Sequence, residues 1–365
     1  MAEKDRIKPY LENLVKGYVF DELSPGFTKK LGAEDILNGV AVPIEAVQFA
    51  EFATGKAEIK GIDIARACGL VLGAVPDFPY SGAYKEFLIK VLGGAKKALE
   101  TLEMQASQYF DEGVQAGARN ADAEAAYEEG SADTEMCFMK AACYFRAALE
   151  IDPASQNALY GYGLSCREIY ENSEDEKKTG DFKAEFMETM EAITVHHPKF
   201  PFAYYYLGYA YLNMGLYLKT QLAWNCFLDY IKEDPAKDEA FDEINEIKER
   251  IATLKDPVRI EEGVMAIESG KYIQGLEILS EYEEGNYANW WPLHYYIGVG
   301  YASMGDADEA ILSFKRALSL SPSNVDVMEE LRMIYEITGD GVNARKYADK
   351  IVRVLNNMEL EKLDN

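Results

Sequence analysis

Few residues of this 365-residue chain have the types and spacing that catalysis or nucleotide binding requires. Thr54-Gly55-Lys56 resembles the end of a phosphate-binding loop. However, no glycine lies five residues before Gly55, and Ala57 occupies the position of the magnesium-binding hydroxyl residue. Gly298-Val299-Gly300 lacks the third glycine of a dinucleotide-binding turn, and no strand pattern precedes it. These glycines therefore predict close helix packing and no nucleotide cofactor.

Histidines, cysteines and paired carboxylates offer no better site. His196-His197 precedes Pro198 at an expected helix end, where a cation suits the partial negative charge of the helix. The five cysteines are scattered without a CxxC pair, which predicts reduced thiols in packed helices and no metal centre. Glu261-Glu262 and Glu283-Glu284 are neighbours in sequence, so on a helix they point about 100° apart and cannot pair as acid and base. We expect no enzymatic activity, no metal and no cofactor.

The charge balance narrows the class of partner. The chain has 37 basic and 63 acidic residues, a formal net charge of −26. Binding phosphates needs a surplus of lysine and arginine, so nucleic acid is not expected as a partner. The first residues lack the apolar core of a signal peptide, and no stretch approaches the ~20 apolar residues of a membrane span. We expect a cytoplasmic protein, away from membranes, with neutral or basic partners.

The clearest pattern lies at residues 291–324, where two amphipathic helices are joined by a glycine turn. The first helix has a face of small and aromatic residues that ends at a glycine. The second helix has an apolar stripe at spacings of four and three, and a proline ends it. In chain order the residues that make this pattern are Gly298, Tyr301, Gly305, Ala310, Phe314, Ala317 and Pro322.

These positions resemble the tetratricopeptide repeat, with Ile297 at the leucine position and His294 where tryptophan is usual. Weaker copies of the pattern follow one another from about residue 100. The resemblance implies an all-α fold, a right-handed α–α superhelix of about five to six degenerate repeats. We therefore predict a tetratricopeptide repeat solenoid behind a helical N-terminal domain.

Three parts are predicted along the chain. Residues 1–100 form a helical N-terminal domain or cap, 101–254 hold repeats one to three plus an extra amphipathic helix at 237–254, and 255–365 hold repeats four to six with a C-terminal cap. The stretch 171–182 has few apolar residues, which predicts a solvated, mobile loop. In the first part, helices are expected at 7–19, 33–38, 43–54, 61–74 and from about 84 onward.

The resemblance implies a concave groove lined by the first helices of the repeats. Its centre is predicted to be apolar and aromatic, and its C-terminal end, with Asp326 and Glu329, acidic. Such a groove suits an extended or helical peptide with apolar anchors and a basic end. Aromatic residues at helical spacing suit a packed core equally well, and the extra helix at 237–254 could fill the groove. The candidate groove residues are Tyr160, Phe202, Tyr205, Tyr209, Leu212, Ile260, Val264, Tyr295 and Val299.

The expected function is that of a non-catalytic scaffold that binds a partner protein through a peptide or helix. Family members that clamp the C-terminal tail of heat-shock chaperones use lysine, asparagine and arginine on these faces. Here Tyr205, Tyr209, Tyr295 and Glu329 stand there, which argues against a chaperone tail as partner. Two alternatives stay open: a peptide-sensing regulator with an N-terminal helical output domain, and an enzyme with a site in residues 1–100. The sequence makes no prediction of the oligomeric state.

Overall fold

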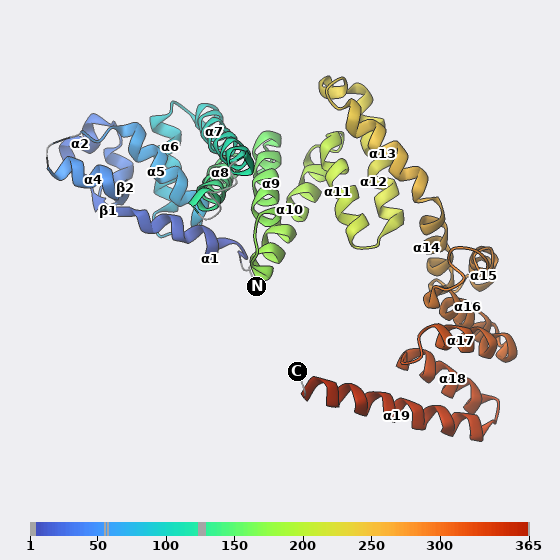
Figure 1. Cartoon of the computed structure of the whole chain (residues 1–365). Coiled ribbons are helices and arrows are strands. Elements are labelled where there is room, and N and C mark those ends of the chain that lie inside the picture. The colour runs from blue at the N-terminus through green and yellow to red at the C-terminus, as the bar shows by residue number, and fades with distance from the viewer. Residues whose placement is uncertain (1–4, 55, 57, 123–128, 364–365) are drawn as a thin grey trace. The chain divides into compact units, whose positions relative to one another are not determined.

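The protein is all-α, as predicted, apart from one small sheet (Figure 1). The computed structural model describes residues 5–54, 56, 58–122 and 129–363. By its internal contacts the chain divides into two compact units. Unit 1 comprises Met1–Ala210 with Asp229–Asp234, and unit 2 comprises Tyr211–Leu228 with Pro235–Asn365. The predicted domain limits at residues 100 and 254 stay a prediction, and each unit is described by itself.

Unit 1 begins with short elements of secondary structure. They are α1 (Lys8–Leu11), a 3₁₀ helix (Glu12–Gly17), β1 (Tyr18–Glu22), α2 (Pro25–Lys30), α3 (Glu34–Leu37), β2 (Ala41–Glu45) and α4 (Ala46–Ala53). Of these, α2 and the two strands were not predicted from the helical periodicity. Strands β1 and β2 pair in antiparallel fashion. The helix predicted over 7–19 is formed by α1 and the 3₁₀ helix as far as Gly17 and is wrong only at its end, where β1 begins at Tyr18. The helix predicted over 43–54 begins three residues later than expected. Val42 and Ile44 explain why a strand forms before α4, because both side chains are buried on β2, which packs against α4.

The core of unit 1 lies between three helices. Helix α5 (Gly61–Ala74) is buried along most of its length and packs against α8 (Glu129–Ile151), which pairs with α7 (Ala95–Asp122). Before them, α6 (Ser81–Val91) ends at Gly93 and Gly94, whose positive φ angles interrupt the helix as their sequence suggests. Gly73 lets α5 approach α8 closely, because a Cβ atom there would lie 1.7 Å from the backbone oxygen of Cys143. Cys68 and Cys143 are both buried in this core.

Helices α9 (Gln156–Glu171) and α10 (Glu176–His196) form the next antiparallel pair. The mobile loop predicted at 171–182 is wrong, because α10 already begins at Glu176. Asp175 caps this helix by accepting a hydrogen bond from the Lys178 backbone N–H at 2.9 Å. Phe182 is buried, with its ring centroid 5.5 Å from that of Tyr10. A helix cap and one long-range aromatic contact thus order a segment that is mostly polar.

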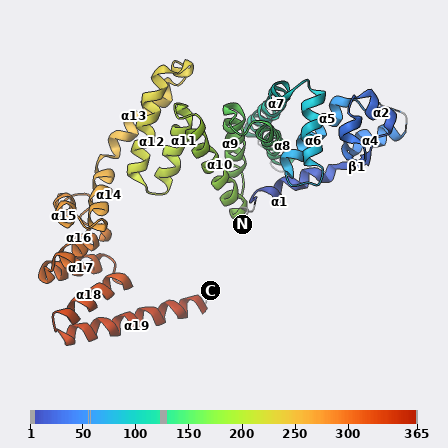
Figure 2. The same ribbon diagram turned by 180° about the vertical axis from the view of Figure 1, so that it is seen from behind.

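Helices α11 (Pro201–Asn213) and α12 (Tyr217–Tyr230) follow, and the unit boundary falls within both of them. After two short 3₁₀ helices, Ile231–Glu233 and Pro235–Lys237, the extra helix predicted at 237–254 appears as α13 (Phe241–Thr253). The remaining helices are α14 (Lys255–Glu268), α15 (Tyr272–Ser280), α16 (Trp291–Met304), α17 (Ala307–Leu320), α18 (Val325–Ile337) and α19 (Gly341–Leu363). They pack as three consecutive pairs, which can be followed from both sides (Figures 1 and 2).

The pair α16–α17 shows why the motif at 291–324 folds as it does. Gly305 ends α16 with a φ of 84°, a conformation that glycine adopts without strain. Phe314 on α17 is fully buried against Gly298, where a Cβ atom would lie only 2.7 Å from the ring. His294 is buried as a packed ring, with its Nε2 atom 2.8 Å from the Ala288 carbonyl oxygen. The small residue on α16 therefore makes room for the aromatic ring on α17.

Candidate functional site

A hollow of about 840 Å³ opens within unit 2 and is lined mainly by the first helices of two successive pairs. Helix α14 contributes Pro257, Ile260, Glu261 and Val264, which recur every three or four residues and so share one helix face. We call this hollow the aromatic groove, because six aromatic side chains border it. These are Tyr217, Tyr287, Trp290, Trp291, Tyr295 and Tyr296.

The aromatic rings of the groove are held by their neighbours. The ring centroid of Tyr295 lies 6.1 Å from that of Trp291 and 5.4 Å from that of Tyr296, both edge-on. On its other side Tyr295 contacts Phe314, at 5.8 Å between centroids. Edge-to-face contacts at such distances are favourable, so the rings are positioned without a ligand.

Trp290 and Trp291 are neighbours that differ in exposure. Trp290 is 41% exposed and borders the groove, whereas Trp291 is half-buried at the start of α16. A large exposed indole beside a cavity is typical of binding surfaces, because it contributes much contact area when a partner covers it.

Carboxylates supply the charge of the groove. Glu261 accepts a hydrogen bond from the Leu218 backbone N–H at 2.7 Å, which fixes its side chain at the wall. Asp326 lies at the start of α18 and is exposed. Burial, together with the charges of Glu330 and Asp326, holds the pKa of Tyr295 above its usual value. The described lining contains neither lysine nor arginine.

Only three of the nine predicted groove residues border the aromatic groove. Ile260, Val264 and Tyr295 border the aromatic groove together, although Ile260 is also part of the core. Val299 is half-buried and packs against the cores on both sides of α16. The four α11 residues, Phe202, Tyr205, Tyr209 and Leu212, are half-buried and do not border this groove. The ninth, Tyr160, lies in unit 1, as do Phe202, Tyr205 and Tyr209.

Helix α13 does not border the aromatic groove. All residues that border it come from 215–217, 257–264, 286–296 and Asp326. Phe241, the first residue of α13, is 64% exposed. The alternative in which this extra helix fills the wider predicted groove stays a prediction.

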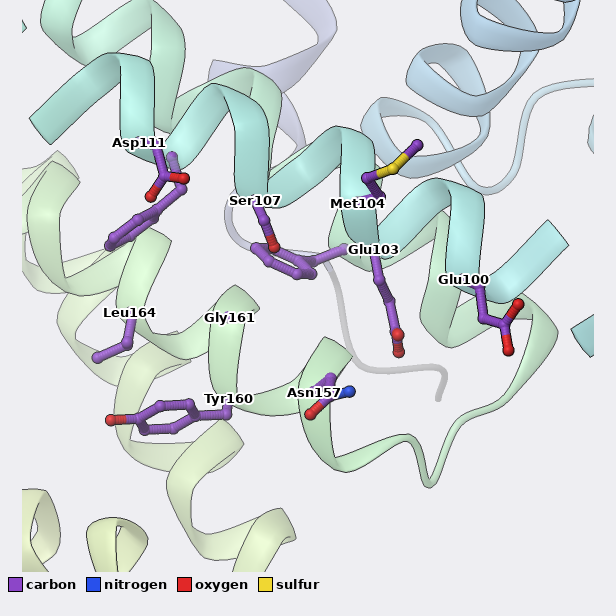
Figure 3. Close-up of a pocket in the computed structure, with 11 residues that line it drawn as sticks. Glu100, Glu103, Met104, Ser107, Asp111, Asn157, Tyr160, Gly161 and Leu164 are labelled. Atoms are coloured by element: carbon purple, nitrogen blue, oxygen red, sulfur yellow. The ribbon is translucent and has the colours of Figure 1, made fainter. Parts of the chain in front are cut away.

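A smaller pocket of about 430 Å³ lies in unit 1 between α7 and α9 (Figure 3). Tyr160, Asn157 and Leu164 line it from α9, and Figure 3 shows Glu103 reaching from α7 toward them. Glu103 accepts a hydrogen bond from the Ser155 hydroxyl at 2.5 Å, so its carboxylate already has a partner at the start of α9. This α7–α9 pocket is half the size of the aromatic groove and has fewer aromatic side chains.

The described residues contain no arrangement for metal binding. No three histidine, cysteine or acidic side chains among them converge as metal ligands. Gly55 and Ala57, next to the lysine of the phosphate-loop fragment, lie outside the described residues. Within the described part, no helix combines the length and apolar content needed to cross a bilayer.

The helix pair that supplies Trp291 and Tyr295 can be placed in a family. Residues 291–324 match the family model of the tetratricopeptide repeat. Residues 291–324 are a tetratricopeptide repeat. The matched segment covers α16 and α17 with the residues that follow them, and its first helix carries four residues that border the groove.

Comparisons over longer stretches of the chain find only weak similarity. No curated protein matches the sequence. A MamA fragment from Desulfovibrio magneticus is 15% identical, with 56% of this chain and 97% of that chain covered and a TM-score of 0.28. YrrB, described as having an unusual peptide-binding site, is 16% identical, with 65% and 97% covered and a TM-score of 0.28. A repeat protein from Parabacteroides merdae is 11% identical, with 90% and 96% covered and a TM-score of 0.28. Nothing about partners follows from likenesses this slight.

Proposed function

We propose that this protein is a non-catalytic scaffold that holds a peptide segment of a partner protein in the aromatic groove of unit 2. Tetratricopeptide repeats support a role in protein–protein interaction. The observation that carries the proposal is the groove itself, a hollow of about 840 Å³ bordered by six aromatic side chains. Binding energy at protein interfaces concentrates in a few tryptophan, tyrosine and arginine side chains that fill or form such hollows.

The helix faces that line the groove suit a peptide. Peptide grooves of helical proteins take apolar anchors at helical or extended spacing, and the α14 and α16 faces offer aliphatic and aromatic contacts in series. Here the polar lining groups are Asn286, Glu261, Asp326 and the tyrosine hydroxyls. The net charge of −26 makes a nucleic-acid partner unfavourable.

A blocking substitution tests the proposal. Peptides that bind the full-length protein are selected from a display library of random twelve-residue sequences, and their affinity is measured by fluorescence anisotropy. Asn286 is exposed and borders the groove, so Asn286→Arg places a longer side chain at its entrance without disturbing the core. We expect Asn286→Arg to weaken binding at least about tenfold, a loss of about 1.4 kcal/mol.

The matched control is Asn356→Arg, which makes the same change at an exposed position on α19 and should leave affinity within about twofold. Selected peptides that bind equally well to wild type and both variants would place the binding surface elsewhere and contradict the proposal.

A further inference from the structure

We propose that the peptide held in the aromatic groove carries an arginine beside its apolar anchor, and that this guanidinium lies between a groove ring and the carboxylate of Asp326. The inference rests on the proposed function of the groove and adds the chemistry of the ligand. It follows from two features of the groove that are found together: aromatic faces and carboxylates without a basic neighbour.

The carboxylates at this end of the groove have no cationic partner within the described structure. Asp326 borders the groove, and Glu330 lies one turn further along α18. No described lysine or arginine forms an ion pair with either of them. Glu329, between them in sequence, is instead held by Arg332 at 2.7 Å. Asp326, which borders the apolar hollow, and Glu330, one helical turn away, therefore remain available to a positive charge from outside.

The aromatic faces fit the same ligand. A guanidinium within about 6 Å of a ring centroid is attracted by the negative face of the ring, and the attraction grows when water is excluded. Arginine suits such a position better than lysine, because its planar group stacks on rings and can donate two parallel hydrogen bonds to one carboxylate. Trp291 and Tyr295 lie on the first turns of α16, a helix that contains no aspartate, glutamate, lysine or arginine.

The protein already contains the proposed arrangement in unit 1. Arg167 lies 5.3 Å from the ring centroid of Tyr206 and donates from its Nε atom to Glu171 at 2.8 Å. One guanidinium thus contacts a tyrosine face and a carboxylate at the same time. The aromatic groove offers Tyr295 and Asp326 in the same roles, and the arginine is the component that is missing.

Electrostatics in the groove favour a cation over an anion. The charges of Glu330 and Asp326 reach the Tyr295 phenol and help to raise its pKa. The N-terminus of α16 also borders the groove and carries about half a positive charge. That partial charge is smaller than the full charges of Asp326 and Glu261, so the potential in the groove stays negative. An acidic peptide would be repelled.

A double-mutant cycle tests the inference. A selected groove-binding peptide that contains arginine is compared with its citrulline analogue, which keeps the shape of the side chain and removes its charge. We expect the exchange to weaken binding to wild-type protein at least about tenfold. With Asp326→Asn the same exchange should cost less than about threefold, because the charge partner has been removed.

Asp308→Asn is the matched control, because Asp308 is the second residue of α17 as Asp326 is of α18, is also exposed and does not border the groove. With this variant the tenfold cost of citrulline should persist. Selected peptides that lose binding to Asn286→Arg but contain no arginine, or whose citrulline analogues bind equally well, would overturn the inference and leave the proposed function standing. If no selected peptide depends on the groove, the proposed function fails as well.

Discussion

Replacing Trp290 with alanine should weaken binding of a groove-selected peptide by about 30-fold or more. Truncating a central aromatic side chain of an interface costs about 2 kcal/mol or more, and each 1.4 kcal/mol is a factor of ten in affinity. The free energy of unfolding should change by less than about 1 kcal/mol, because Trp290 is 41% exposed and lies outside the helices. Isothermal titration calorimetry gives the affinity, and urea denaturation gives the stability of the same sample.

Phe241 provides the control for this substitution. It is an aromatic residue with 64% exposure at the start of α13, and it does not border the groove. Phe241→Ala should therefore leave the affinity within about twofold. Undiminished binding by Trp290→Ala would show that the exposed indole takes no part in recognition, and the groove would lose its main anchor.

The substitution Gly73→Ala should destabilise unit 1 by about 3 kcal/mol or more. The added Cβ would lie 1.7 Å, 2.5 Å and 2.9 Å from the backbone O, C and Cα atoms of Cys143. These are backbone atoms inside α8, so no side-chain rotation relieves the overlap, and α5 and α8 must move apart. Overpacking of a core costs about 1–3 kcal/mol even where flexible side chains yield, and a clash with backbone belongs at or above the top of that range.

Urea denaturation followed by circular dichroism measures the effect of Gly73→Ala. Gly82→Ala is the matched control, because Gly82 also lies in a helix but has no atom within 4 Å of the position of a Cβ. This control should be neutral or slightly stabilising, since alanine favours helix more than glycine by up to about 1 kcal/mol. An unchanged unfolding midpoint for Gly73→Ala would mean that the two helices do not approach as described.

The helix pairs were predictable because their signals are local. Gly298 and Phe314 lie 16 residues apart, and the requirement for a small residue opposite a ring can be read from their spacing within one motif. The wrong predictions lie where contacts between residues distant in sequence determine the local structure. β1 pairs with β2 across two intervening helices, α2 and α3, and no helical period signals such a pairing. Phe182 orders the start of α10 partly through Tyr10, which is distant in sequence.

The candidate site was predictable only in part, for the same physical reason. Ile260, Val264 and Tyr295 come from regular helices, where period and register place a residue on a face. Tyr217, Tyr287 and Trp290 come from a helix start and a connecting segment, where no helical period places a residue on a face. The motif at 291–324 places the two tryptophans at the start of a helix, but it does not predict that Trp290 is exposed.

Fluorine NMR of protein labelled with 5-fluorotryptophan tests the central claim most directly. The chain has three tryptophans, of which Trp290 and Trp291 border the groove, whereas Trp224 is fully buried and does not border it. Resonances are assigned with single Trp→Phe variants and followed as a selected peptide is added. A peptide bound in the aromatic groove should shift the Trp290 and Trp291 signals and leave Trp224 in place. Saturating binding that moves neither of the groove signals would contradict the account.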